Sequence, residues 1–232
     1  MDGSGLKENL KKFQEEMADA ARRAGRSVQD ITLVAVSKTH GPDRVAELYN
    51  YGQRIFGENY VQEAAAKMDE LSGLGIDWHF IGHLQSNKAR QVAGRFAMVQ
   101  TVHSAKLARR LNDILQETGG VQPVLVQVNL GEEKQKSGVR PEESGRLCTA
   151  IEEMSGLDLK GLMVLPPFFE DGEKSRPYFA RLRQLKEKME RELGRRLPHL
   201  SMGMTADFPQ AIEEGATLIR VGTRLFGPRE YK

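Results

Sequence analysis

The sequence predicts a single α/β domain over residues 1–232, folded as a closed (β/α)8 TIM barrel with an additional helix before the first strand. Eight short apolar runs alternate mainly with helix-like stretches, which is typical of a parallel sheet covered by helices. The length of 232 residues suits this fold, because such barrels routinely form one domain of that size. No low-complexity linker or fixed-period repeat divides the chain. A doubly wound open sheet is the alternative, since it shows the same alternation.

Composition narrows the class of protein before any motif is considered. Lysine plus arginine (34) nearly balances aspartate plus glutamate (32), which argues against a nucleic-acid wrapper and a polybasic membrane-surface protein. No stretch approaches the roughly 20 apolar residues that span a bilayer, and the N-terminus lacks the apolar block of a secretory signal. The single cysteine, Cys148, excludes an intramolecular disulfide and fits a reducing compartment. We therefore expect a soluble cytoplasmic protein that binds neither nucleic acid nor membrane.

The first segment, residues 4–25, is predicted to be an amphipathic helix. Its apolar residues recur at steps of three and four, which places them on one face of a helix. They are Leu6, Leu10, Phe13, Met17, Ala20 and Ala24. Ser4 has the side chain of an N-cap residue, and Gly25 can end the helix. The β-branched run that follows, Ile31–Val36, is typical of a strand buried on both faces of a parallel sheet.

The later elements are predicted in the same alternating order. The expected strands are Ile31–Ser37, Arg54–Gly57, Trp78–Gly82, Met98–Val102, Val124–Asn129, Gly161–Leu165, Leu200–Gly203 and Leu218–Gly222. The expected helices are Pro42–Tyr51, Val61–Leu71, Ala105–Thr118, Glu142–Met154, Arg176–Leu193 and Phe208–Glu214. The clearest helix has Ser175 as N-cap, Pro177 in its first turn and Gly194 after its end. Cys148 falls in a helix-like stretch and is predicted to be a small core residue.

Polar residues just after the strands are the candidate site, because the carboxyl ends of barrel strands carry the functional site of this fold. The first of them is Lys38, which follows the apolar run Leu33–Val36. A lysine at this place would project from a buried strand into the mouth of the barrel, where partial desolvation suits an amine for Schiff-base chemistry. A lysine that only extends its charge toward solvent is the alternative.

Small and hydroxyl-bearing residues end the last two strands. Ser201, Gly203 and Thr205 end the seventh strand, and Gly222 and Thr223 end the eighth. Glycines let backbone amides approach an anion, and hydroxyls donate hydrogen bonds to phosphate oxygens. The loops after these two strands commonly bind phosphate in barrels. The glycines could also serve only as turns, but together with the lysine the phosphate interpretation is favoured.

Arg220 lies two residues before Gly222, so the two are expected on the same side of the last strand. A charged guanidinium inside a barrel needs a partner. A ring nitrogen that accepts a hydrogen bond is one candidate, and the carboxylate of Asp207 is the other. A reactive lysine, phosphate donors and an arginine facing a ring nitrogen together describe a site for pyridoxal 5′-phosphate (PLP), a phosphorylated pyridine aldehyde.

Seven motifs follow one another along the chain. They are Leu33–Thr39, Phe56–Glu63, Trp78–Lys88, Lys136–Gly138, Leu162–Met163, Ser201–Asp207 and Arg220–Gly227. These motifs resemble those of the pyridoxal phosphate homeostasis protein family, and the resemblance extends over essentially the whole chain. Thr205 is a small departure, because the family more often has serine there.

The resemblance implies a fold and a set of cofactor contacts. The fold is an alanine-racemase-like barrel, the type III PLP fold, in which Lys38 holds PLP as an internal aldimine. The residues implied to bind the cofactor are Lys38, Asn59, Ser201, Gly203, Arg220, Gly222 and Thr223. In this set the serine, the glycines and the threonine contact the phosphate, Arg220 faces the pyridine nitrogen, and Asn59 lies near the ring.

Three observations favour a PLP carrier over an enzyme. Racemisation needs two bases on opposite faces of the Cα carbon, and the sequence places no tyrosine opposite Lys38. The chain ends at Lys232, so no second domain of the kind that closes racemase sites is expected. A cation at the pyridine nitrogen also makes the ring a weaker electron sink. The leading hypothesis is therefore reversible binding, buffering and delivery of PLP in vitamin B6 homeostasis, with PLP-dependent apoenzymes as recipients.

Two other functions stay open. One is a PLP-dependent racemase or lyase of small amino acids, and the other is a phosphate-binding isomerase barrel without a Schiff base. His79 and His83 share one strand parity, but the sequence nominates no third ligand, so no metal site is expected. Glu58 suits either a carboxylate base or the N-terminus of a helix. A monomer is expected.

Overall fold

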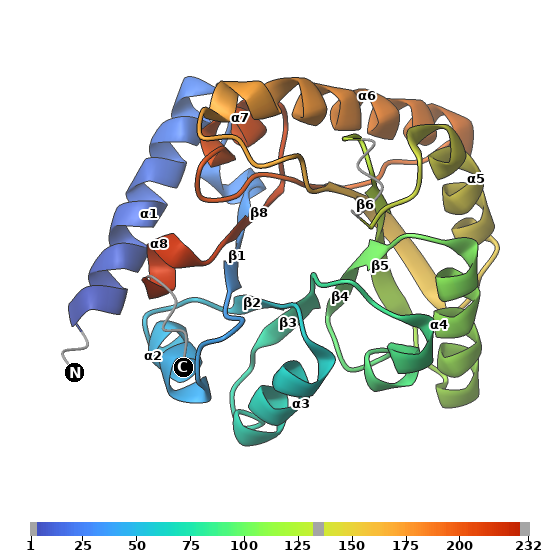
Figure 1. Cartoon of the computed structure of the whole chain (residues 1–232), viewed down its shortest axis with the longest axis horizontal. Helices are drawn as coiled ribbons and strands as arrows, with labels where there is room; N and C mark the ends of the chain where they lie inside the picture. The colour runs from blue at the N-terminus through green and yellow to red at the C-terminus, as the bar shows by residue number, and fades with distance from the viewer. Residues whose placement is uncertain (1–3, 132–136, 228–232) are drawn as a thin grey trace.

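The computed structural model is a closed barrel of eight parallel strands in their order along the chain (Figure 1). The strands are β1 (Thr32–Val36), β2 (Ile55–Glu58), β3 (Asp77–Phe80), β4 (Met98–Val102), β5 (Gln122–Val128), β6 (Leu157–Val164), β7 (His199–Ser201) and β8 (Leu218–Val221). Closure depends on β8, which pairs with β1 through Val34 and Arg220 among others. This pairing confirms the barrel and excludes the open sheet. The structure describes residues 4–131 and 137–227.

Helices surround the barrel on its outer side (Figure 1). They are α1 (Ser4–Arg23), α2 (Pro42–Asn50), α3 (Val61–Glu70), α4 (Ala105–Thr118), α5 (Pro141–Glu152), α6 (Arg176–Leu193), α7 (Phe208–Glu213) and α8 (Thr223–Phe226), with 3-10 turns η1 (Val28–Asp30), η2 (Ser86–Gln91) and η3 (Gly172–Ser175). The short η2 connects β3 to β4, and α8 directly follows β8; the sequence predicted neither. Within the described ranges, no helix has the length and apolarity needed to cross a membrane.

Helix α1 lies along the side of the barrel next to α7 and α8 (Figure 1). Five of the six residues of its predicted apolar face are buried, and Ala24 is partly buried beyond the end of the helix. The ring of Phe13 packs against that of Phe208 at 4.9 Å between centroids. The helix ends at Arg23, two residues before the predicted end, and Gly25 follows with a left-handed φ of +66°. The predicted cap depends on the side chain of Ser4, which is not among the described side chains.

Strand β6 starts at Leu157, four residues before the predicted start at Gly161. Asp158 and Lys160 alternate with buried residues at this end and form an ion pair (Oδ2 to Nζ, 2.6 Å). Because polar residues alternate here, the start of the strand does not belong to a continuous apolar run and was not predicted. Gly161 has φ +153°, and a Cβ there would lie 1.9 Å from the carbonyl oxygen of His199. Strand β6 therefore passes too close to β7 for any side chain at this position.

Two predictions about α5 and α6 have different outcomes. Cys148 on α5 is fully buried, as predicted, and burial raises the pKa of its thiol to about 12. Ser175 stands directly before α6, but its side chain makes no capping hydrogen bond. Its backbone is already helical (φ −80°, ψ −23°) because it ends η3, so the predicted cap is wrong. Gly194 ends the helix with φ +66°, as predicted.

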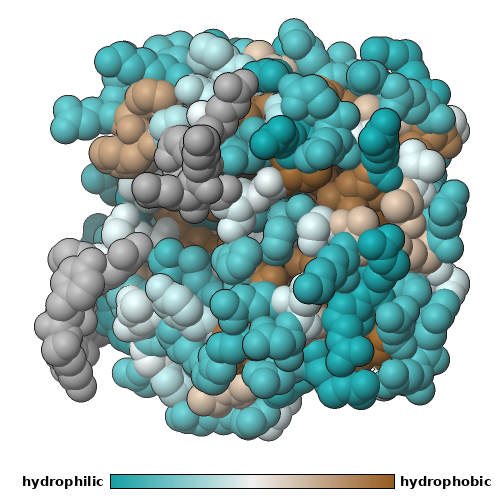
Figure 2. Space-filling view, turned by 45° about the vertical axis from the view of Figure 1, so that its right-hand side comes forward, coloured by the Kyte–Doolittle hydropathy of each residue, from teal (hydrophilic) through white to brown (hydrophobic). Residues whose placement is uncertain are grey.

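The surface is mostly hydrophilic on the face that Figure 2 shows, with hydrophobic side chains mainly in the hollows between polar ones. This distribution agrees with a core that lies inside the barrel and between the barrel and its helices. Among the described residues, the exposed large hydrophobic side chains are Tyr60, Val121 and Phe168. Phe168 is 78% exposed and lies beside the cavity described next.

Candidate functional site

A cavity of about 450 Å³ opens where the carboxyl ends of the strands meet their loops. Its lining residues are Val36, Lys38, His40, Asn59, Ile81, Leu165, Pro167, Phe168, Phe169, Met204, Thr205, Ala206, Asp207, Arg220, Gly222 and Thr223. Five of the seven residues predicted to bind the cofactor are among them: Lys38, Asn59, Arg220, Gly222 and Thr223. The barrel thus brings together residues from both halves of the chain.

Lys38 lies half-buried on the wall of this cavity, two residues after the end of β1. Val34 and Ala35 are fully buried, so the strand leads from the core directly to the lysine. The chain then turns at Thr39, whose φ of +68° is the one positive value among the described non-glycine residues. This conformation costs about 1–2 kcal/mol for a residue with a Cβ, so other contacts must hold the turn.

Glu58 ends β2 but does not line the cavity. Its side chain is fully buried and accepts hydrogen bonds from the hydroxyl of Ser37 (2.6 Å) and the ammonium group of Lys67 (2.7 Å). Burial raises the pKa of the Glu58 carboxyl, and the nearby Lys67 opposes that shift. The structure therefore assigns Glu58 to a buried ion pair, in place of the two roles predicted for it.

Asn59 follows Glu58 and contributes to the cavity wall. Its Oδ1 is buried and has no hydrogen-bond partner. An unpaired buried acceptor costs about 1–3 kcal/mol, so a ligand that donates a hydrogen bond here would remove that cost. Gly82 makes the arrangement possible, because a Cβ at this position would lie 2.0 Å from the carbonyl oxygen of Asn59.

Arg220 lies inside the barrel with only 4% of its surface exposed. Its guanidinium donates hydrogen bonds to Ser201 Oγ (2.5 Å) and to the carbonyl of Val164 (2.9 Å). Asp207, one of the two candidate partners named for Arg220, accepts a hydrogen bond from the backbone N–H of Met204 (2.7 Å). Burial lowers the pKa of Arg220 to about 10, and the charge of Asp207 opposes this shift. The guanidinium therefore stays charged at neutral pH.

The bond from Arg220 begins a chain of buried hydrogen bonds across the barrel. Ser201 Oγ lies 2.6 Å from Gln100 Oε1, and Gln100 Nε2 lies 2.8 Å from His79 Nδ1. A guanidinium can only donate, so Ser201 must donate to the amide oxygen, and the amide nitrogen must donate to His79. His79 therefore carries its proton on Nε2. The pKa of His79 is lowered to about 4, mainly by burial and further by His199.

Hydroxyl groups gather where the loops after β7 and β8 meet. Thr205 Oγ1 lies 3.4 Å from Thr223 Oγ1, and both residues line the cavity. Gly222 lines the same wall, where a Cβ would come within 3.1 Å of the carbonyl oxygen of Val36. Thr223 begins the short α8, and a short extra helix after these strands often accompanies phosphate binding in barrels. This end of the cavity offers hydroxyl donors and closely approaching backbone to an anion.

Ser201 and Gly203 are the two predicted binding residues that do not line the cavity. The hydroxyl of Ser201 is engaged by Arg220 and by the amide of the adjacent Gln100. Gly203 is buried with φ +92°, and a Cβ there would lie 2.6 Å from that of Ala211. Their contact with phosphate stays a prediction. In the structure the hydroxyl of Ser201 accepts a hydrogen bond from Arg220, and the absence of a side chain at Gly203 leaves room for Ala211.

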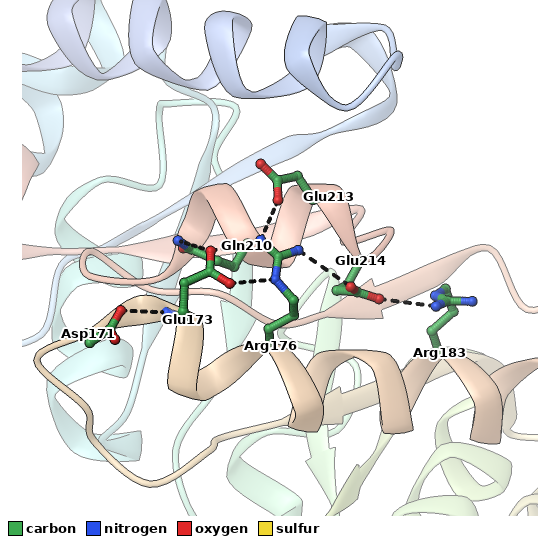
Figure 3. A network of polar contacts seen from close by, with 7 residues as sticks. All are labelled: Asp171, Glu173, Arg176, Arg183, Gln210, Glu213 and Glu214. Atoms are coloured by element: carbon green, nitrogen blue, oxygen red, sulfur yellow. Dashed lines mark hydrogen bonds and ion pairs between the residues drawn. The ribbon is translucent and has the colours of Figure 1, made fainter.

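An aromatic loop after β6 borders the cavity with Phe168 and Phe169. Its far end leads into η3 and α6, which a polar network joins to α7 (Figure 3). Within that network Arg176 forms ion pairs with Glu173 of η3 and with Glu213 and Glu214 at the end of α7. The members are Asp171, Glu173, Arg176, Arg183, Gln210, Glu213 and Glu214. Because α7 directly follows residues 204–207, the network fastens together both loops that border the cavity.

The histidines considered for a metal site take separate partners. His79 belongs to the buried chain, whereas His83 Nδ1 lies 2.6 Å from Ser137 Oγ, and its ring lies 4.8 Å from that of His103. In residues 4–131 and 137–227, no group of three or more potential ligands is arranged to hold a metal ion. Lys136, which opens one of the seven motifs, lies outside these ranges.

Gln100 and Lys67 are two polar residues near the site whose roles were not predicted from the sequence. Gln100 interrupts an apolar strand, and this was a usable signal, because a polar side chain inside a barrel requires a partner. Lys67 lies four residues after Glu63 in a helix, a spacing that usually indicates a solvated ion pair. Only the packing of α3 on the barrel shows that Lys67 is buried.

Comparison with known proteins gives the following relatives. The family model of the alanine racemase N-terminal domain matches residues 8–230. The pyridoxal phosphate homeostasis protein of Aquifex aeolicus is 42% identical over 224 residues, which cover 97% of this chain and 98% of that protein. PipY of Synechococcus elongatus PCC7942, solved with PLP bound, is 36% identical with a TM-score of 0.85, covering 96% of this chain and 100% of that one. An alanine racemase of Clostridium difficile, 17% identical, shares the fold with a TM-score of 0.73, covering 99% of this chain and 58% of that one.

Proposed function

The chain belongs to the family of pyridoxal phosphate homeostasis proteins, and we propose that it binds PLP in the cavity, with Lys38 as the covalent anchor. We further propose that it buffers PLP in the cytoplasm and delivers it to PLP-dependent apoenzymes. The observation that carries the proposal is that an amine, a buried guanidinium and a pair of hydroxyls line one cavity. The PLP-bound structure of the relative PipY supports the same choice of ligand.

The lining groups suit PLP part by part. Lys38 supplies an amine for the aldehyde, and the hydroxyls of Thr205 and Thr223 suit the phosphate. Asn59 Oδ1, buried without a partner, suits a hydroxyl that donates a hydrogen bond, such as the one on the PLP ring. Arg220 supplies a donor for the ring nitrogen. Each functional group of the proposed ligand therefore has a counterpart on the wall.

The covalent step that we propose is a reversible condensation. The unprotonated amine of Lys38 attacks the aldehyde carbon, a carbon–nitrogen double bond forms, and the aldehyde oxygen leaves as water. Addition of water reverses the step and releases PLP. The balance needs no oxidant, reductant or further reactant, so the same residue can serve both capture and release.

Arg220 favours holding the ligand over transforming it. Its guanidinium is charged at neutral pH and is fixed by hydrogen bonds to Ser201 and Val164. A cation facing the pyridine nitrogen disfavours protonation of the ring, and an unprotonated ring is a weaker electron sink. This electrostatic arrangement supports a carrier rather than a racemase or lyase.

Titration with PLP tests the covalent anchor. The protein should gain an absorbance band at about 420 nm, and borohydride reduction followed by mass spectrometry should place the label on Lys38. Lys38→Ala should abolish both signals. The matched control is Lys188→Ala, which removes a 59% exposed lysine of α6 and should leave both signals unchanged. A label on another residue, or no label, would refute the proposal.

Two further assays address what the loaded protein does. Incubation with alanine in deuterated water should leave the Cα hydrogen in place, and rapid exchange would favour the racemase or lyase instead. For delivery, the loaded protein should reactivate an apo-aminotransferase while excess phosphatase destroys free PLP. Failure to reactivate under these conditions would count against delivery but not against binding.

A further inference from the structure

Lys67 is a buried ammonium group on α3, next to the strand end that carries Lys38. Only 4% of its surface is exposed, and its Nζ lies 2.7 Å from each of three acceptors: the carbonyl of Ser37, Glu58 Oε1 and Glu63 Oε1. An ammonium group has three N–H donors, so its hydrogen-bonding capacity is fully used. We call Lys67, Glu58 and Glu63 the Lys67 cluster.

The cluster holds the residues on both sides of Lys38. Ser37, directly before it, accepts from the ammonium group with its carbonyl and donates its hydroxyl to Glu58 (2.6 Å). Thr39, directly after it, donates its backbone N–H to Glu63 (2.6 Å). One lysine and two carboxylates from α3 and β2 therefore fix the backbone on either side of the candidate anchor.

The conformation of Thr39 indicates why such contacts are needed. Its φ of +68° lies in the left-handed region, which a β-branched residue adopts only when surrounding contacts impose it. The hydrogen bond to Glu63 is such a contact, and the N–H of His40 closes the turn on the carbonyl of Ser37 (3.1 Å). The direction in which Lys38 leaves the backbone depends on this turn.

Stability alone does not account for the Lys67 cluster. Apolar side chains of similar volume often stabilise a protein as well as a buried ion pair does. The two carboxylates outnumber the single ammonium group, and Glu58 Oε2 is buried without a partner. None of the three residues lines the cavity, so their effect on a ligand must pass through the segment that carries Lys38.

We propose that the Lys67 cluster is a positioning device that sets the direction of the Lys38 side chain toward the cavity. The inference rests on the proposed function, because it assumes that the Lys38 amine is the group that captures the ligand. The cluster residues act as positioning residues, since they hold the backbone of Ser37 and Thr39 and do not line the cavity.

Glu63 allows the sharpest test, because its side chain is 25% exposed and water can reach the position it leaves. Glu63→Ala removes the acceptor for the N–H of Thr39, whereas Glu63→Gln keeps an amide oxygen there. The matched control is Gln53→Leu. The buried amide of Gln53 donates to the carbonyls of Leu33 and Ile55. It therefore joins β1 and β2 at their amino ends, whereas the Lys67 cluster lies at their carboxyl ends.

Two rates are measured for each variant, both by mass spectrometry of Lys38. The first is the rate of borohydride-trapped PLP attachment, and the second is the rate of reductive methylation by formaldehyde without PLP. Glu63→Ala should slow PLP attachment between about tenfold and a hundredfold, since misplacing a reacting group costs a comparable factor. Methylation should rise toward the rate of the exposed Lys188, because Lys38 is no longer held in place. Glu63→Gln should restore both rates.

The outcomes separate the inference from its premise. Wild-type PLP attachment in a folded Glu63→Ala protein would overturn the positioning role, and so would an equal loss in Gln53→Leu, which would indicate a general structural effect. If the wild-type protein forms no adduct at Lys38, the proposed function fails. The methylation rates of Glu63→Ala and Glu63→Gln then decide the positioning role by themselves.

Discussion

Acidification from pH 7 to pH 5 should destabilise the protein through His79. This histidine is 5% exposed and accepts a hydrogen bond from Gln100, and burial is the main cause that lowers its pKa from 6.5 to about 4. The unfolded chain keeps the ordinary pKa of 6.5. Between these two values the unfolded chain binds more protons than the folded one, so the free energy of unfolding falls as the pH falls. The stabilising effect is complete above pH 6.5 and is lost on the way down to about pH 4.

The magnitude follows from the two pKa values. A shift from 6.5 to about 4 amounts to about 3.4 kcal/mol when protonation is complete, at 1.36 kcal/mol for each pKa unit. Linkage places about 2 kcal/mol of this loss between pH 7 and pH 5. The main physical reason is that burial removes water from the charged imidazolium, and His199 adds to this effect. An imidazolium also cannot accept at Nδ1, so protonation removes the hydrogen bond from Gln100.

Urea denaturation followed by circular dichroism at the two pH values measures this loss. The comparison is with His79→Asn, whose amide oxygen branches from the same Cγ as Nδ1 and can accept from Gln100 without titrating. The variant should lose about 2 kcal/mol less than the wild type between pH 7 and pH 5. Equal losses in the two proteins would refute the assignment of this pH dependence to His79.

Three further substitutions test other parts of the site. Ser201→Ala should lower the free energy of unfolding by about 2–3 kcal/mol in urea titrations, because it leaves the buried guanidinium of Arg220 without one of its acceptors. A loss below about 0.5 kcal/mol, which is typical of a surface substitution, would contradict this expectation. Gly203→Ala should lower the free energy of unfolding by about 2–4 kcal/mol, because the new residue would have a left-handed φ and would clash with Ala211. A melting temperature equal to that of the wild type in calorimetry would contradict this packing. Thr223→Val should weaken PLP binding about tenfold or more in spectroscopic titrations while leaving stability nearly unchanged, since its hydroxyl is exposed and suits a charged phosphate. Unaltered affinity would remove this residue from the phosphate site.

Much of the fold was predictable because the barrel repeats one simple pattern. Eight apolar runs separated mainly by helices predict the number of units, and Arg176–Leu193 has the predicted bounds. The misses have local causes. Strand β6 starts at Leu157 behind the alternating Asp158 and Lys160, and η2 and α8 are too short to show a helical period.

The candidate site was predictable where residues directly follow strands, because barrel topology alone carries Lys38, Asn59 and Thr223 to one end. Sequence position does not tell how side chains pair in the interior. The hydrogen bond that the hydroxyl of Ser201 accepts from Arg220 was therefore not predictable, and the predicted phosphate contact of Ser201 stays a prediction. Burial of Lys67 depends on how α3 packs, which no helical period reveals.

Closure of the barrel by β8 determines when the cavity can form during synthesis of the chain. Strand β1 lies between β2 and β8, so Lys38 and Asn59 meet Arg220 and Thr223, which are synthesised after them. A nascent protein that still lacks its eighth strand has the amine but neither the guanidinium nor the final hydroxyl. The complete cavity wall therefore forms only after the eighth strand has been synthesised and has paired with the first.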